Sequence, residues 1–187
     1  MTDLGVIHGR FQVLHNDHMK YLLAGKVRCK HLIIGITNPD PSLVRQDSTD
    51  EARSQAAANP LTYYERYVMI REAMLDVEID HLDFSIVPLP INVPELFKYY
   101  VPTDARFFLT IYDDWGRRKL EIMRTLGLKT EVMWERSPEE KGITSSQVRD
   151  LMNNGELWEH LVPPSVAKLM NWWKIPDRIR IIMGGSS

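Results

Sequence analysis

The sequence has little that would suit a secreted, membrane-embedded or nucleic-acid-binding protein. It contains one cysteine, Cys29, so the chain cannot form an internal disulfide, and we expect a reducing, cytoplasmic setting. No apolar run reaches the roughly 20 residues that a membrane helix needs, and no basic segment followed by an apolar stretch opens the chain. The formal net charge of -2 argues against nucleic acid as a partner.

The sequence does contain a regular alternation of strand-like and helix-like segments. Strands are expected at 4–8, 31–37, 83–89, 105–112 and 129–135. Helices are expected at 16–25, 61–75, 94–100, 113–127, 144–155 and 163–173. Such alternation requires crossover connections, so we predict a Rossmann-like α/β fold with an open parallel five-stranded sheet and helices on both faces.

A chain of 187 residues suits one domain, here 1–187. We expect a small C-terminal helical part at 156–175 and a flexible tail at 181–187. The long segment 38–59 has no clear period, and such loops are usually functional, so we expect it to order when a nucleotide binds. In open α/β sheets ligands bind at the carboxyl ends of the strands. That rule brings 9–18, the loop after Thr37, 111–118 and 136–149 to one rim.

The first candidate segment is HGRFQVLHNDH, at the junction of a strand and a helix. Gly9 allows a ligand to approach the backbone closely. His15 and His18 lie one helical turn apart beside the free N–H groups of a helix start, a place that favours phosphate. Imidazoles there can stabilise charge that develops in a transition state. A partial zinc site without a third ligand, or plain surface residues, would show the same pair.

The second segment is GITSSQVRDLM. Thr144, Ser145 and Ser146 begin a helix, and Arg149 follows on the same face one turn later. Hydroxyl donors, a helix N-terminus and an arginine together make an anion site, although a capped helix with a solvated arginine would have the same sequence.

Together the two segments resemble the signature pair of the HxGH nucleotidylyltransferase superfamily. GRFQVLHNDH is similar to G-R-F-Q-P-x-H-x-G-H, and ITSSQVR matches I-[ST]-S-[ST]-x-[IV]-R throughout. Within the superfamily the chain looks most like archaeal-type nicotinamide-mononucleotide adenylyltransferases, because NPLTYYER and the late Trp158 with Val162-Pro163 resemble two further motifs of that branch. The likeness covers roughly residues 4 to 172.

The resemblance implies direct transfer of AMP from ATP to nicotinamide or nicotinate mononucleotide, forming NAD or its acid analogue and pyrophosphate. His15, His18 and Arg149 would be catalytic. Contacts to ATP would come from Gly9, Arg10, Phe11, Thr144, Ser145, Ser146 and Arg149. Mg²⁺ would arrive with the ATP, so no protein ligand for a metal is assigned. Related enzymes are often oligomeric, which leaves a homo-oligomer open.

Several residues depart from the family pattern. Asp17 stands where the first motif has glycine, and Ala58 stands where the branch usually has Lys or Arg. Arg45 or Arg53 could replace that missing contact. Ile91 stands at the place of an aspartate near the family's ring-binding tryptophan.

We therefore expect substrate contacts from other residues of the rim. Trp115 could stack a pyridine ring or a base, or pack between helix and sheet. The candidate substrate contacts are Asp113, Asp114, Trp115, Arg117 and Phe97.

Two alternatives stay open. The turn KGITSS also resembles that of cytidylyltransferases, which use CTP and another phosphorylated acceptor. A nucleotide-binding protein without turnover would also be compatible with Asp17 and Ala58.

Overall fold

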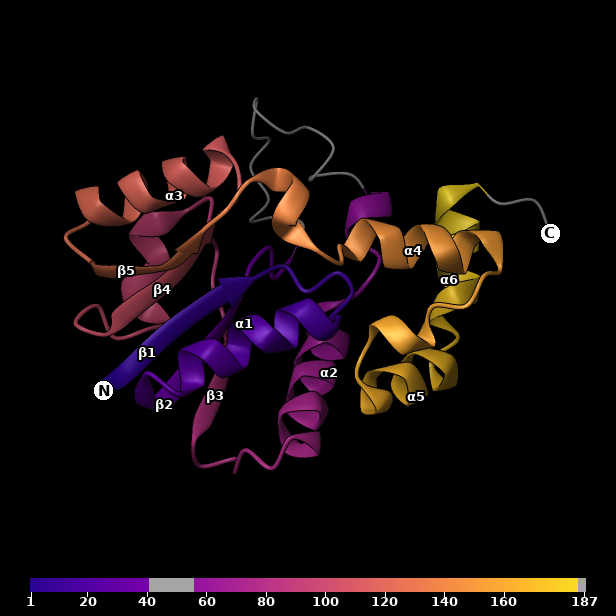
Figure 1. The fold of residues 1–187 in the computed structure, drawn as a ribbon, viewed down its shortest axis with the longest axis horizontal. Coiled ribbons are helices and arrows are strands. Elements are labelled where there is room, and N and C mark those ends of the chain that lie inside the picture. The colour runs from indigo at the N-terminus through magenta and orange to yellow at the C-terminus, as the bar shows by residue number, and fades with distance from the viewer. Residues whose placement is uncertain (41–55, 185–187) are drawn as a thin grey trace.

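The computed structural model describes residues 1–40 and 56–184, and its strands all lie in one sheet (Figure 1). The strands are β1 (Thr2–Gly9), β2 (Cys29–Ile36), β3 (Phe84–Pro88), β4 (Arg106–Ile111) and β5 (Lys129–Glu135). The α-helices are α1 (Asn16–Lys26), α2 (Tyr63–Asp76), α3 (Asp114–Thr125), α4 (Ser145–Asn154), α5 (Pro164–Trp172) and α6 (Ile175–Met183). Short 3-10 helices are η3 (Ala56–Ala58), η4 (Pro94–Tyr99), η5 (Pro138–Lys141) and η6 (Glu159–Leu161).

The sheet is parallel, with the strand order β3-β2-β1-β4-β5. The predicted five-stranded Rossmann-like fold is therefore confirmed. The order reverses direction between β1 and β4, and this switch point is where such sheets bind ligands. Gly9 ends β1 there and Ile111 ends β4, so the two strands deliver the chain to the same edge.

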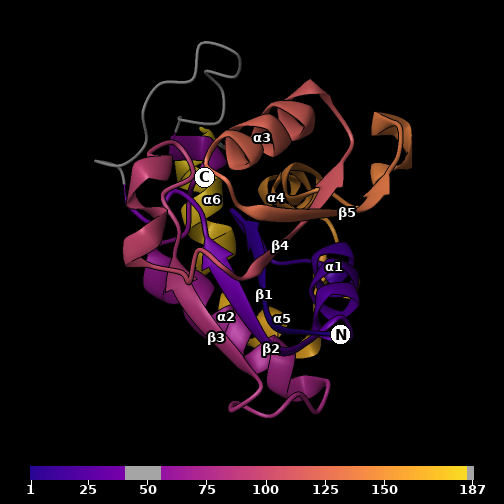
Figure 2. The ribbon, with the colours of Figure 1, turned by 90° about the vertical axis from the view of Figure 1, so that its left-hand side faces the viewer.

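Hydrophobic residues cover both faces of the sheet. On one face Ile7, Ile34 and Phe108 pack in a core with side chains from α1, α2 and α4–α6. On the other face Val6 and Phe107 pack in a second core with side chains from α3 and η4. Figure 2 shows α3 and α1 on opposite sides of the strands. Adjacent residues of a strand point to opposite faces, which explains why these strands are nearly continuous apolar runs.

The C-terminal helices form a group beside the sheet (Figure 1). An ion pair of 2.7 Å between Arg178 of α6 and Glu65 of α2 attaches this group to the α/β core. Ile175 and Ile179 are buried in the first core, and α6 continues to Met183. The C-terminal helical part therefore extends beyond the expected limit of 175, and α6 includes the first residues of the tail expected from 181. Among the described residues no helix is both long and apolar enough to cross a membrane.

Candidate functional site

The two histidines of the first motif cap their own helix. The ring of His15 accepts the backbone N–H of His18, and the ring of His18 accepts the backbone N–H of His15, through their Nδ1 atoms at 3.3 and 3.4 Å. This reciprocal arrangement is a capping box made of two imidazoles. His15 is thus the N-cap of α1, although imidazole is not among the usual capping side chains.

The capping hydrogen bonds determine the tautomer of both imidazole rings. An Nδ1 that accepts a hydrogen bond carries no proton, so each neutral ring has its N–H at Nε2. The rings stack, with centroids 3.7 Å apart. Their Nε2–H groups are therefore held together as a pair of donors, which is the arrangement that stabilises an oxyanion.

The loop before α1 is hydrogen-bonded to Arg66 of α2. This guanidinium is 2% exposed and donates to the carbonyls of Arg10, Thr37 and Asn38 at 2.8–3.0 Å. Burial lowers the pKa of Arg66 to about 10. The arginine of NPLTYYER thus joins the chain after β1 to the chain after β2, so it positions the site without lining it.

The first motif is also bound to the second. The Ser145 hydroxyl donates to the carbonyl of Val13 at 2.9 Å, and Arg149 donates to the carbonyl of Gln12. The Gln12 side chain in turn makes two hydrogen bonds of 2.9 Å to the backbone of Leu61. Three segments that are far apart in the sequence therefore form one hydrogen-bonded unit.

Arg149 is more buried than a residue that only binds phosphate needs to be. It is 6% exposed, and its second donor group lies 3.1 Å from the Ser146 hydroxyl. Burial lowers its pKa. Thr144 caps α4 by accepting the N–H of Gln147. The hydroxyl groups of this turn therefore cap α4 and bind Arg149, and the turn also presents the N-terminus of the helix.

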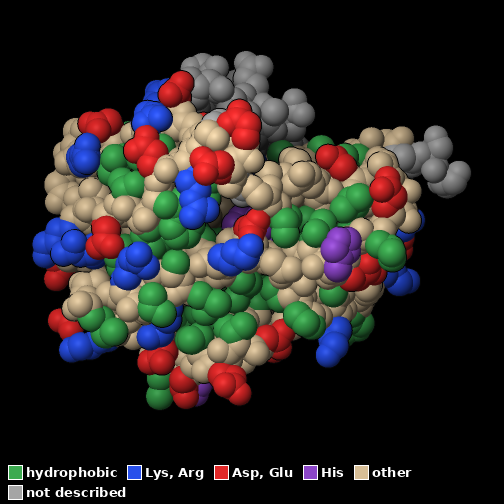
Figure 3. All heavy atoms as spheres, in the orientation of Figure 1, with side chains coloured by type: hydrophobic (Ala, Val, Ile, Leu, Met, Phe, Trp, Pro, Cys, Tyr) green, Lys and Arg blue, Asp and Glu red, His purple; other side chains and the backbone are tan. Residues whose placement is uncertain are grey.

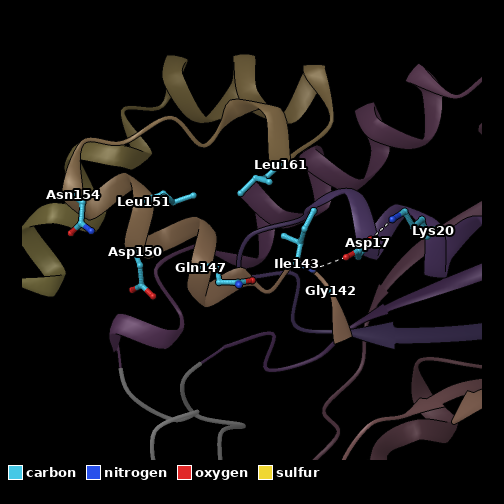
Figure 4. Close-up of a pocket in the computed structure, with 9 residues that line it drawn as sticks. All are labelled: Asp17, Lys20, Gly142, Ile143, Gln147, Asp150, Leu151, Asn154 and Leu161. Atoms are coloured by element: carbon cyan, nitrogen blue, oxygen red, sulfur yellow. Dashed lines mark hydrogen bonds and ion pairs between the residues drawn. The ribbon is translucent and has the colours of Figure 1, made fainter. Parts of the chain in front are cut away.

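Asp17 connects the two motifs on the other side (Figure 4). Its carboxylate accepts the backbone N–H of Ile143 at 2.6 Å and pairs with Lys20 at 2.5 Å. Partial burial acts to raise the pKa of Asp17, but the Lys20 ammonium and the Ile143 N–H outweigh it and the net shift is downward. A side chain at Gly142 would collide with this carboxylate. Asp17 and Ile143 also help to line a larger hollow of about 580 Å³ beside α4.

A smaller cavity of about 160 Å³ lies at the switch point. Figure 3 shows a histidine in a hollow near the middle of this face of the molecule. The cavity is lined by His8, Gly9, His15, Asp17, His18, Tyr21, Leu109, Thr110, Tyr112, Lys119, Trp134 and Ile143. Of the expected site residues, Gly9, His15 and His18 are in this set. Gly9 packs against the Phe11 ring, which a side chain there would meet at 2.8 Å.

Two residues that line the cavity, His8 and Lys119, are not among the site residues expected from the sequence. His8 is 6% exposed, and burial, with the charge of Lys119 as a second cause, lowers its pKa to about 3. Lys119 lies on α3, with its ammonium 6.0 Å from the centre of the Trp115 ring. His8 directly precedes Gly9 at the end of a buried strand, a signal that could have marked it. Nothing in the sequence distinguishes Lys119 from its neighbours Arg117 and Arg118.

The expected substrate residues have other contacts in the structure. Asp113 caps α3 by accepting the N–H of Gly116 at 2.8 Å, and Arg117 pairs with Glu135 and, at 3.8 Å, with Asp114. Phe97 is 1% exposed and stacks on Phe107 in the second core. Its ring has no surface left for a substrate, so the expectation for Phe97 is not supported. The helix α3 contributes Lys119 to the cavity instead.

Comparison with known proteins places this geometry in a family. A phosphonoformate cytidylyltransferase of Streptomyces viridochromogenes is 48% identical over 176 residues, which cover 94% of this chain and 95% of that protein. A nicotinamide-nucleotide adenylyltransferase of Thermococcus kodakarensis is 28% identical and is covered over 89% of its length. The chain belongs to the nucleotidylyltransferase superfamily. No family model matches it.

A solved structure shows the same fold for this nucleotidylyltransferase. The bifunctional NMN adenylyltransferase/ADP ribose pyrophosphatase of Francisella tularensis superimposes with a TM-score of 0.64 at 17% identity. That superposition covers 91% of this chain and 50% of the other, so the chain spans about half of the two-activity protein.

The described part of the chain contains no group of three or more His, Cys, Asp or Glu residues that could hold a metal ion. The zinc alternative for His15 and His18 therefore has no third ligand there. Arg45 and Arg53, the proposed replacements for the contact missing at Ala58, lie outside the described residues, as does most of the loop 38–59.

Proposed function

We propose that this nucleotidylyltransferase transfers CMP from CTP to a small phosphonate of the phosphonoformate type and releases pyrophosphate. The observation that carries the proposal is the 48% identity to the phosphonoformate cytidylyltransferase, against 28% to the Thermococcus adenylyltransferase. The departures from the adenylyltransferase pattern agree with it. Ile91 packs against the second core at the place of an aspartate, and Phe97 is buried in the same core.

The size of the cavity also favours a small acceptor. Pockets for drug-sized ligands have volumes of roughly 300–1,000 Å³. The cavity at the switch point has about 160 Å³. Phosphonoformate is a phosphonate joined directly to a carboxylate, whereas a pyridine mononucleotide carries a ring and a ribose besides its phosphate. The larger hollow beside α4, which Ile143 and Gln147 help to line at the start of that helix, has the volume for a nucleotide-sized group.

The reaction requires positioning and charge neutralisation. A phosphonate oxygen attacks the α-phosphorus of CTP, and the bond to the bridging oxygen of the β-phosphate breaks as the new P–O bond forms. Pyrophosphate leaves with the electron pair, and no side chain needs to take a proton from the ionised phosphonate. The Nε2–H groups of His15 and His18 would donate to the oxygens on which charge develops. The N-terminus of α4 would favour the leaving pyrophosphate.

Mg²⁺ would offset the charge of the triphosphate when it is bound with the nucleotide. Asp17 is the one carboxylate among the described residues that line the cavity, and it is already engaged by Lys20 and by the N–H of Ile143. This donor set fits an ion held mainly by the phosphates.

The proposal is tested by pyrophosphate release in Mg²⁺ with CTP or ATP, each paired with phosphonoformate, nicotinamide mononucleotide or nicotinate mononucleotide. We expect release with CTP and phosphonoformate, together with a ³¹P spectrum of a new mixed anhydride. Release with ATP and a pyridine mononucleotide alone would overturn the proposal and establish the adenylyltransferase activity that the motifs first suggested. CTP binding without release in any pairing would favour a nucleotide-binding protein.

The second candidate, adenylyl transfer to a pyridine mononucleotide, is favoured by one specific observation. The NPLTYYER segment, which resembles the adenylyltransferase branch, is bound to the first motif through Gln12 and Arg66. The side chains of both residues hydrogen-bond to backbone groups, so this unit supports the loop and does not choose the base or the acceptor.

A further inference from the structure

His8 is a polar residue in a place where an apolar one would be expected. It lies in β1 directly after the core residue Ile7, is 6% exposed, and lines the cavity at the switch point. Neither of its ring nitrogens has a hydrogen-bond partner among the residues that the structure describes. Buried polar groups without partners are rare in folded proteins, because each loses its bonds to water without replacement. Such a group in a cavity wall indicates a partner that arrives with a ligand.

Lys119 indicates the sign of the charge that such a ligand would carry. It reaches the same cavity from α3, on the opposite side of the sheet from α1, and its charge acts on the His8 ring. A neutral ring with one N–H donor beside an ammonium disfavours a cation and favours an anion. The size of the cavity limits that anion to a few heavy atoms.

This corner is distinct from the phosphate-binding features of the nucleotide. His15, His18 and the hydroxyls of 144–146 belong to the N-termini of α1 and α4, which both lie on the first core's side of the sheet. His8 and Lys119 come from the end of β1 and from α3. A small acceptor that spans the cavity would place its attacking oxygen near the histidine pair and its remaining charged group near His8 and Lys119.

We propose that His8 and Lys119 form a subsite for the carboxylate of the acceptor, so that the enzyme selects small phosphonates with a carboxylate next to the phosphorus. This rests on the proposed function and adds the residues that select the acceptor. The His8 N–H donates to the carboxylate and Lys119 neutralises it. Both are specificity residues, because they touch the part of the acceptor that does not react.

The test compares His8→Leu and Lys119→Met with the wild-type protein in steady-state kinetics. We expect each variant to raise the KM for phosphonoformate by ~10-fold or more, the effect of losing one charge-assisted hydrogen bond, while the KM for CTP stays within ~2-fold. The His8→Leu protein should be at least as thermostable as the wild type, since it removes a buried polar group without a partner. Arg124→Met is the control, because Arg124 lies on α3 but pairs with Glu121 at the surface.

A second acceptor distinguishes loss of carboxylate binding from a loss that affects every acceptor. Methylphosphonate keeps the attacking group and lacks the carboxylate, so the wild type should prefer phosphonoformate by ~10-fold or more and both variants should lose most of this preference. An unchanged KM for phosphonoformate in folded His8→Leu protein would overturn the subsite. An equal loss with both acceptors would also overturn it, since the pair would then act on the phosphonate.

Failure of the proposed function can be distinguished from failure of the subsite. If the wild-type protein shows no turnover with CTP and phosphonoformate, the subsite is tested by calorimetric titration of the protein with phosphonoformate alone. Binding that disappears in both variants would support the subsite without the reaction. Binding that is equal in wild type and variants, or absent in all three, would rule it out.

Discussion

The carboxylate of Asp17 accepts the backbone N–H of Ile143 at 2.6 Å, so a residue that departs from the first motif holds the second motif in place. The departure from the family pattern therefore has a structural explanation. The turn at Gly142 is shaped around this carboxylate, because a side chain at Gly142 would collide with it.

We predict that Asp17→Ala weakens nucleotide binding more than it weakens the fold. Loss of the contact to Ile143 frees the turn that leads into α4, so the KM for CTP should rise ~3–10-fold, the size of one hydrogen bond, with less than about 1 kcal/mol lost in stability. Asp17→Asn keeps an acceptor oxygen and serves as the matched control, while Lys20→Met removes only the exposed ion pair. Equal KM values for Asp17→Ala and wild type would show that the contact does not order the site.

Much of the fold could be predicted from the sequence, because its determinants are local. The strand β5 lies at the expected residues 129–135, and Thr62 with Glu65, a local pattern typical of a helix start, forms a capping box at the beginning of α2. The parallel order follows from the strand–helix alternation. The helix α6 was not predicted, because the last helix was expected to end at 173 and the tail to begin at 181, although Pro176 is typical of the first turn of a helix.

The site was predictable only where a motif carried it. His15, His18 and Gly9 line the cavity as expected, but Lys119 does so only because the packing of α3 on the sheet turns it inward. The burial of Phe97 likewise depends on η4 packing against Phe107, which no local pattern specifies. Contacts between segments far apart in sequence, such as Arg149 with Gln12, decide which polar residues face a ligand and which support the backbone.

His15→Asn separates the catalytic role of the histidine pair from its capping role. Asparagine is a good N-cap, so the start of α1 and the melting temperature should be retained, but the Nε2–H donor is lost. We expect kcat to fall ~10²-fold, the usual effect of removing one preorganised donor. His18→Ala should lower kcat by ~10² or more and also cost about 1 kcal/mol, because it removes half of the reciprocal cap. Normal turnover in either folded variant would refute the catalytic assignment.

Arg66→Met should affect stability without affecting chemistry. The guanidinium is 2% exposed, and its loss leaves the carbonyls of Arg10, Thr37 and Asn38 without their donor. We expect a loss of about 3 kcal/mol or more in denaturant unfolding, while kcat of the folded fraction at low temperature stays within ~5-fold of wild type. Arg71→Met, on the exposed face of the same helix, is the control and should cost little, since Arg71 forms an exposed ion pair with Glu72. A large fall in kcat with unchanged stability would place Arg66 at the substrate.

The buried ring of His8 should make the stability of the protein depend on pH. Its pKa is about 3 in the folded state and near 6.5 in the unfolded chain, so the unfolded state binds more protons between these values. Stability is therefore fully present above pH 6.5 and is lost as the pH falls toward 3. At about 1.4 kcal/mol per unit of pH, the part lost by pH 5 is about 2 kcal/mol.

His8→Leu removes this titration, so its free energy of unfolding should decline less between pH 7 and pH 5 than that of the wild type. Urea titrations at several pH values measure the difference. Thr110→Val is the control, because Thr110 lines the same cavity and does not titrate, so its profile should parallel the wild type. Identical slopes for His8→Leu and wild type would mean that burial does not lower the pKa of His8 in the folded state, and the pH dependence predicted here would be wrong.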